Sequence, residues 1–298
     1  MSSQKHFKPW AFILPGLLAG TVILGIPIVQ AFWNSLHQLR LYRMDQQMFI
    51  GLANYARLWQ DPIFLLSARV TIVFTVGCTV LSVVAALAIA AVMSTRGIRG
   101  TTMARFYMAF FLIPFVATQV IVGVIGRLFV WEPEYGFVNF LLALFGVDGP
   151  GWLISTDTAL IATIITNAWR LTPLALLIFY AALATVPSEL LESAEVDGAG
   201  GVVAFLRVKL PLIRYHIGFV TLILLTSAFR EFDMVYSLTG GGPGRATNVL
   251  SLHVYNQGIS SANMGVANAI AFSMLLLVSV LSVIYIRVAK LGDLSGPE

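Results

Sequence analysis

The hydrophobic residues of this chain fall into long runs separated by short polar segments. Six runs are long enough to cross a bilayer, because a membrane-spanning helix needs about 20 apolar residues. They occupy residues 10–36, 67–94, 103–130, 158–182, 214–238 and 266–288. The strict polar–apolar alternation of a membrane β-barrel is absent from the sequence. The pattern therefore predicts an all-α fold, in which residues 1–298 form a single membrane domain of six transmembrane helices.

Composition supports a membrane protein. The 298 residues are 58% hydrophobic and only 11% charged, whereas soluble domains average about 25% charged residues. The first run is too long for a signal-peptide core and no small-residue cleavage site closes it, so we expect a retained helix. The single cysteine, Cys78, excludes a disulfide framework, and we expect no metal site.

The distribution of cations predicts an orientation. The segments before the first run, between the second and third, between the fourth and fifth, and after the sixth contain ten of them: Lys5, Lys8, Arg96, Arg99, Arg105, Arg207, Lys209, Arg214, Arg287 and Lys290. The other side has four: Arg40, Arg43, Arg57 and Arg245. Because cytoplasmic loops carry the excess of Lys and Arg, both termini are expected in the cytoplasm. The net charge of +4 then needs no nucleic-acid partner, and membrane lipid surrounds the chain.

The segment between the fourth and fifth runs, residues 186–211, predicts two short helices joined by a tight turn. Pro187 suits a helix start. Three acidic residues at a spacing of three line one face of the first helix: Glu189, Glu192 and Glu195. Glycines end it: Gly198, Gly200 and Gly201. The second helix is expected over 202–210, ending at Pro211. The pattern alone leaves two interpretations open, a docking element for a cytoplasmic partner or an ordinary amphipathic surface helix.

Within this segment, the run from Glu192 to Ala199 resembles the "EAA" loop of binding-protein-dependent ABC importer permeases. It departs at Ser193, where alanine is usual. The positions that carry the resemblance are Glu192, Ala194, Asp197, Gly198, Ala199, Phe205 and Pro211. In that family the loop inserts into a cleft of an ATP-binding subunit as a coupling helix. The resemblance implies the same role for residues 186–211, which we call the EAA-like loop.

Two further stretches resemble the sugar-importer permeases of the maltose and glycerol-phosphate type. These are Leu238–Pro243, preceded by Phe232 and Asp233, and Phe49–Leu58. The resemblance covers nearly the whole chain and is to the six-helix variety. It implies a permease that passes a sugar, polyol or glycerol phosphate from an extracellular or periplasmic binding protein into the cytoplasm by alternating access. The implied location is the cytoplasmic membrane of a bacterium or archaeon. The implied partners are a second, related permease, two cytoplasmic ATP-binding subunits and the binding protein.

The chain is not expected to be an enzyme. A G-x-x-x-x-G-K-[ST] phosphate-binding loop is absent from the sequence, and the glycines at 240–242 are followed by Pro243 rather than by lysine and Ser/Thr at the required places. The chain should therefore need no cofactor of its own. ATP and Mg²⁺ would bind to the partner subunits.

Polar residues inside the predicted spans are candidates for a substrate path, because they are costly there and usually face a cavity or a partner. The fourth and fifth runs supply them: Asn167, Trp169, Arg170, Arg230, Glu231, Asp233 and Tyr236. Hydrogen-bonding groups and aromatic faces suit a sugar, and the two arginines suit a phosphate. Alternatively, Arg230 pairs with Glu231, Asp233 or a partner's charge and merely holds the bundle together. Three tryptophans are expected in an interfacial belt: Trp10, Trp33 and Trp131.

The glycines after the fifth run also leave two interpretations. Gly240, Gly241, Gly242 and Pro243 could simply end the helix, or form a flexible external loop that contacts the binding protein or the sugar.

Two other classes of function compete. A secondary transporter driven by an ion gradient would have paired acidic residues deep in its spans and inverted repeats; we find neither, since Glu231 and Asp233 are placed near the surface. A membrane-embedded enzyme needs a catalytic constellation, which four scattered histidines and one cysteine do not supply.

Overall fold

The computed structural model describes residues 10–95, 97–98 and 100–289. Within these, the chain divides into two compact units, residues 1–64 with 253–276, and residues 65–252 with 277–298. The single membrane domain stays a prediction. Half of the ten cations on the predicted cytoplasmic side lie outside the described residues: Lys5, Lys8, Arg96, Arg99 and Lys290.

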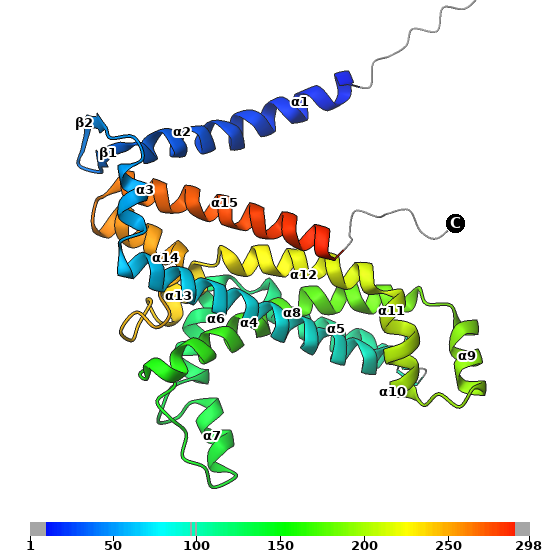
Figure 1. Cartoon of the computed structure of the whole chain (residues 1–298). Coiled ribbons are helices and arrows are strands. Elements are labelled where there is room, and N and C mark those ends of the chain that lie inside the picture. Colours follow the sequence, from blue (N-terminus) through cyan, green and yellow to red (C-terminus); the bar gives the residue numbers. More distant parts are fainter. Residues whose placement is uncertain (1–9, 96, 99, 290–298) are drawn as a thin grey trace, which may run out of the picture. The chain divides into compact units, whose positions relative to one another are not determined.

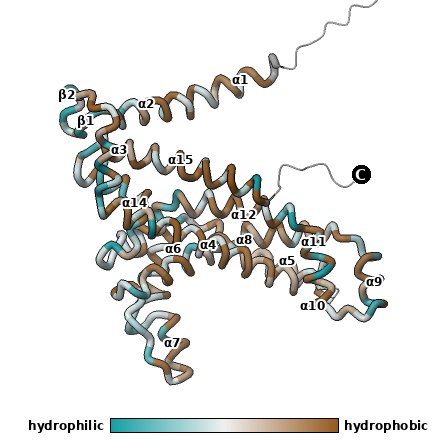
Figure 2. The backbone as a smooth tube through the Cα atoms, viewed as in Figure 1, coloured by the Kyte–Doolittle hydropathy of each residue, from teal (hydrophilic) through white to brown (hydrophobic). Residues whose placement is uncertain are grey.

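The described chain is a helical membrane fold, as predicted (Figure 1). Four helical segments are long and apolar enough to span a bilayer: Ile13–Ser35, Pro62–Met93, Thr156–Ala184 and Met264–Val288. Two bent pairs satisfy the same criteria if each is one span: Thr102–Val116 with Gln119–Val130, and Gly201–Leu212 with Arg214–Phe229. The structure thus has four helices that could span a membrane, or six if each bent pair is one span. The apolar residues follow these helices (Figure 2).

The first unit contains a β-hairpin that the sequence pattern did not reveal. It follows the first span, which consists of α1 (Trp10–Gly20), a π-helical turn (Thr21–Gly25) and α2 (Ile26–Ser35). The antiparallel strands are β1 (His37–Arg40) and β2 (Arg43–Phe49), and α3 (Ala53–Leu58) comes next. Asn54 fixes the hairpin because its Nδ2 donates to the carbonyls of Ser35 (2.7 Å) and His37 (3.0 Å). The sequence pattern did not predict strands here, because β1 is only four residues long and too short to show a clear alternation.

The second unit is built around α8 (Thr156–Ala184), which packs against α5 (Thr102–Val116) and α12 (Arg214–Phe229). α4 (Pro62–Met93) enters the same unit and presents a buried face to α8. The connections carry the short helices: α7 (Phe137–Ala143), α9 (Ser188–Val196), α10 (Gly201–Ala204) and α11 (Leu210–Leu212). The helix α14 (Leu250–Tyr255) begins in the second unit and leads through a π-helical turn of the first unit (Asn256–Ser260) to α15 (Met264–Val288), whose last part returns to the second unit.

The third predicted span is broken rather than continuous. α5 ends at Val116, two extended residues follow, and α6 (Gln119–Ile125) with its π-helical extension (Gly126–Val130) departs at 97°. Pro114 lies near the end of α5 and weakens its last turns, because it cannot donate a backbone hydrogen bond to the carbonyl of Phe110. The side chain of Thr118 then caps α6 by accepting from the N–H of Ile121.

The fifth predicted span, 214–238, ends early. α12 stops at Phe229, and α13 (Asp233–Leu238) is a separate helix that packs against α6. Gly123 makes this packing possible, because a Cβ on it would lie 2.0 Å from the Ser237 Oγ and 2.7 Å from the Met234 carbonyl oxygen. The short helices α6 and α13 thus pack against each other, whereas the pattern predicted one continuous helix over 103–130 and another over 214–238.

The EAA-like loop and a buried polar network

The EAA-like loop forms two helices, as predicted. α9 ends in a Schellman motif, in which the N–H of Gly198 donates to Glu195 O (3.0 Å) and the N–H of Ala199 to Ala194 O (2.9 Å). Gly198 has a φ of +80°, the left-handed conformation that glycine adopts without steric cost. The expected glycine turn is therefore confirmed, and Ala194 contributes to it through its backbone carbonyl.

The second helix of the loop does not end at Pro211. α10 passes through a π-helical turn (Phe205–Lys209) into α11, and the chain bends by 73° only at Ile213, before α12. In the π-helical turn the N–H of Leu210 reaches the carbonyl of Phe205. The widened turn accommodates Pro211 inside the helix, so the proline does not act as a stop.

The tip of the EAA-like loop is solvent-exposed. Glu192, Asp197, Gly198 and Pro211 are exposed, and Ala199 and Phe205 are half-buried. A hollow of about 660 Å³ lies between α9, α10 and the end of α4. Coupling roles for these residues stay predictions, but the loop has the accessibility that docking requires.

The predicted substrate-path residues separate into two groups. Asn167, Arg170 and Glu231 are buried, whereas Trp169, Arg230, Asp233 and Tyr236 are exposed. Among the exposed group, the ring of Tyr236 stacks on that of Phe232 at 5.4 Å. A role for either group in a substrate path stays a prediction.

The buried group forms an ion pair between α8 and the break after α12. Arg170 Nη2 lies 2.5 Å from Glu231 Oε2, and both residues are under 10% exposed. Arg170 also donates from Nε and Nη2 to Asn167 Oδ1 (3.1 and 2.8 Å). The expectation that Glu231 sits near the surface is therefore wrong, because the helix breaks at Arg230 and turns the next side chain inward.

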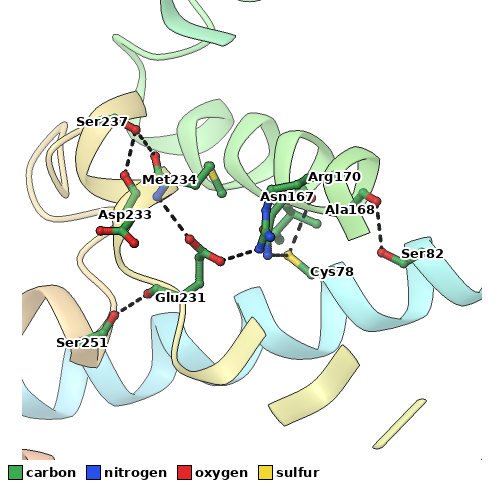
Figure 3. Close-up of polar contacts among 11 residues, drawn as sticks. Cys78, Ser82, Asn167, Ala168, Arg170, Glu231, Asp233, Met234, Ser237 and Ser251 are labelled. Atoms are coloured by element: carbon green, nitrogen blue, oxygen red, sulfur yellow. Dashed lines mark hydrogen bonds and ion pairs between the residues drawn. The ribbon is translucent and has the colours of Figure 1, made fainter. Parts of the chain in front are cut away.

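Glu231 ties three segments together (Figure 3). Its Oε1 accepts from the backbone N–H of Met234 (3.1 Å), which fixes the start of α13. Its backbone carbonyl accepts from the hydroxyl of Ser251 in α14. On the other side of the pair, Asn167 Nδ2 donates to Cys78 Sγ in α4 (3.5 Å). These residues form a buried polar network across the second unit.

α4 contributes a polar face that the sequence analysis missed. Six small polar residues on its buried side are under 10% exposed: Ser67, Thr71, Thr75, Cys78, Thr79 and Ser82. Ser82 donates to Ala168 O of α8 (3.2 Å), and Ser67 accepts from Asn248 (2.7 Å). The signal that could have revealed this face is the spacing of four along 67, 71, 75 and 79 within an apolar run.

The glycine turn after α13 is held by hydrogen bonds. Thr247 donates to Gly242 O (2.8 Å) and shares a hydrogen bond with Thr239 (2.7 Å). Gly241 has a φ of +90° and packs so closely that a Cβ would lie 2.7 Å from Leu252. The turn itself therefore requires glycine at two of the three positions, Gly240 and Gly241, because both have a positive φ. Contact of Gly240–Pro243 with a binding protein or sugar stays a prediction.

Of the tryptophans expected in an interfacial belt, Trp33 is exposed, but Trp131 is buried at 3% exposure. Its Nε1 donates to Thr166 Oγ1 of α8 (2.7 Å). The belt prediction is wrong for Trp131, because its side chain is buried against α8 and not exposed at an interface.

The described residues thus contain continuous and bent membrane helices and an exposed helix–turn–helix loop that follows one of them, which are the features of a polytopic membrane protein. The family model for the inner-membrane component of binding-protein-dependent transport systems matches residues 79–291. The chain belongs to this family.

Two relatives are similar over almost their whole length. The trehalose/maltose transport system permease MalF of Thermococcus litoralis is 32% identical over 94% of this chain and 93% of its own. The sn-glycerol-3-phosphate transport system permease UgpA of Shigella flexneri is 30% identical over 95% of this chain and 94% of its own. The resemblance to sugar and glycerol-phosphate permeases is confirmed.

The fold has been solved before. A chain of a bacterial alginate ABC transporter, in complex with an alginate pentasaccharide-bound periplasmic protein, superposes with a TM-score of 0.79. The match covers 97% of this chain and 96% of that one at 19% identity. Such low identity establishes the shared fold alone.

Proposed function

We propose that this chain is one of two different permeases in an ATP-driven carbohydrate importer, with both termini in the cytoplasm. The observation that carries the proposal is the exposed EAA-like loop with its glycine turn, directly after α8. Two cytoplasmic ATP-binding subunits hold the ATP and Mg²⁺. Their closure on ATP moves this loop, and the attached spans switch the path from inward-facing to outward-facing.

The buried ion pair bears on the choice of substrate. A phosphate needs unneutralised cations, but the guanidinium of Arg170 already faces the carboxylate of Glu231. A phosphate ester could use Arg170 only by displacing that carboxylate. A neutral sugar needs no such exchange, and the exposed rings of Trp169 and Tyr236 suit its apolar face. We therefore propose a neutral carbohydrate as the preferred substrate, and the exposed Arg230 is the remaining candidate cation for a phosphate ester.

Reconstitution tests this function. The chain is incorporated into vesicles with its cognate second permease, two ATP-binding subunits and binding protein, and uptake of labelled maltose, trehalose and sn-glycerol 3-phosphate is measured. We expect ATP-dependent uptake of a neutral sugar by the complete complex, and neither uptake nor ATP hydrolysis by the chain alone.

Ionophores, which collapse ion gradients, distinguish ATP-driven uptake from uptake by a secondary transporter. Uptake driven by ATP should persist when ion gradients are collapsed. Uptake that stops with the gradient, or that the isolated chain performs without ATP, would contradict the proposal. Calorimetry of the binding protein against the same ligands then identifies the sugar.

A further inference from the structure

Helix α7 lies in the loop between the broken third span and α8. Its polar side chain is buried and its aromatic side chains are exposed, the reverse of a helix that faces water. Its only polar residue, Asn139, is 8% exposed, while Phe137 is 58% and Phe140 59% exposed. The apolar surface continues beyond the helix through Leu144 and Phe145, which are 65% and 83% exposed. A helix facing water places its polar residues outward, so the surroundings of α7 are not water.

A scaffold of hydrogen bonds fixes this orientation. Asn139 accepts from Trp152 Nε1 (2.7 Å) and donates to the carbonyls of Pro133 (2.9 Å) and Pro150 (3.4 Å). The helix ends in a second Schellman motif, in which Gly146, at a φ of 72°, donates to Ala143 O. The aromatic side chains therefore point outward because the loop is built to present them.

The start of the loop lies at membrane depth. Trp131 donates to Thr166, which is ten residues inside α8 and thus about 15 Å from its start. The 29 residues of α8 extend about 43 Å, which exceeds the hydrocarbon core by about 13 Å. Even if all of this excess lay at the start of α8, Thr166 would still lie at the edge of the core. The indole tip of Trp131 therefore reaches the boundary of the hydrocarbon core, and α7 begins only six residues after Trp131.

The apolar side chains of α7 lie beside the end of a membrane span. Phe129, in the last turn of the third span, lines the same hollow of about 610 Å³ as Phe137 and Phe140 of α7. Glu134 and Asp148 also line this hollow. Figure 2 shows apolar residues along much of α7. The exposed rings of α7 thus lie beside the end of the third span, and the two carboxylates mark the polar edge of the same hollow.

We propose that α7 is an interfacial helix that inserts Phe137, Phe140 and Leu144 into the bilayer at the end of the third span. With the orientation proposed above, this is the outer leaflet. Residues 128–169 contain four carboxylates and no lysine or arginine. Attraction to anionic lipid therefore does not contribute, and burial of apolar and aromatic side chains holds the helix in a zwitterionic surface.

Spin-label accessibility tests the proposal on the complete complex in nanodiscs. Phe140→Cys and Leu144→Cys are labelled with a nitroxide; Glu134→Cys and Asp148→Cys are the matched controls. The chain without an introduced cysteine reports background from Cys78, which is fully buried. Collisions with oxygen, which concentrates in the bilayer, are compared with collisions with a water-soluble nickel chelate.

We expect the labels at 140 and 144 to collide more with oxygen than with nickel, and the two controls to show the reverse. The depth should be the same in nanodiscs with and without anionic lipid. Preference for nickel at 140 and 144 would overturn the proposal, and so would protection from both reagents, which would place a protein partner on this face. ATP hydrolysis stimulated by the binding protein, measured on the same particles, shows separately whether the importer function holds.

Discussion

At the scale of single residues, the ion pair between Arg170 and Glu231 is the feature with the largest energetic consequence. Taking two charges out of water is unfavourable, and their attraction offsets this only with good geometry and further hydrogen bonds. Here Asn167 and the backbone of Met234 supply those bonds. Loss of one partner leaves the other charge buried and uncompensated.

We therefore expect Arg170→Met or Glu231→Leu to destabilise the folded chain by about 3–5 kcal/mol, and the double substitution to cost less than either single one. The measurement is the thermal midpoint of the purified complex in detergent. Arg230→Ala and Asp233→Asn, on exposed neighbours, are the controls and should leave the midpoint nearly unchanged. If Arg170→Met abolishes uptake without lowering the midpoint, the guanidinium serves the substrate rather than the fold.

At the scale of elements, the turn of the EAA-like loop could need a glycine at position 198 for two reasons: its left-handed backbone or the close approach of another subunit. Gly198 has open space around it: a Cβ added there would have nothing within 4 Å, so a side chain meets no obstacle within the chain itself. The left-handed backbone alone costs an ordinary L-residue about 1–2 kcal/mol, while asparagine tolerates it better. Close approach of another subunit would instead exclude any side chain.

We expect Gly198→Leu to reduce copurification of the ATP-binding subunit and sugar uptake, without unfolding the membrane helices. Gly198→Asn discriminates the two reasons: retained docking indicates that the turn geometry matters, and lost docking indicates close approach. Gly200→Ala is the control, because its φ of −65° suits alanine. If the Gly198→Leu chain still binds the ATP-binding subunit and takes up sugar at the full rate, the loop does not couple ATP hydrolysis to transport.

At the scale of the whole molecule, α8 links the two ends that should face opposite sides of the membrane. The loop with α7 precedes it and α9 follows it. Its 29 residues extend about 43 Å, enough to cross the core completely. The orientation of these ends is inferred from the excess of cations in the segments on the side of α9.

We expect single cysteines at Asp148 and Glu189 to react with a membrane-impermeant maleimide from opposite sides, Asp148→Cys from outside and Glu189→Cys only after the membrane is opened. The neighbouring Gly149 is not a suitable position for the introduced cysteine, because a Cβ there would lie 1.9 Å from Asn139 Oδ1. Labelling of both from one side would disprove the topology.

The sequence by itself determined the class of this protein. Spans follow from the length of apolar runs, because each helix satisfies its own backbone hydrogen bonds whatever its neighbours are. The turn at Gly198 followed in the same way, since the conformation it needs is a local property. The family followed from motifs that are contiguous along the chain.

Only the tertiary structure decided how polar residues are used. Arg170 and Glu231 are 61 positions apart, and their pairing depends on where α12 breaks. The short helix after the break, α13, packs against Gly123 of α6, a contact that no local pattern encodes. The same holds for Trp131, whose burial against Thr166 reversed the prediction of an interfacial side chain. Local propensity predicts where helices form, but contacts between distant segments determine where they stop and which face is buried.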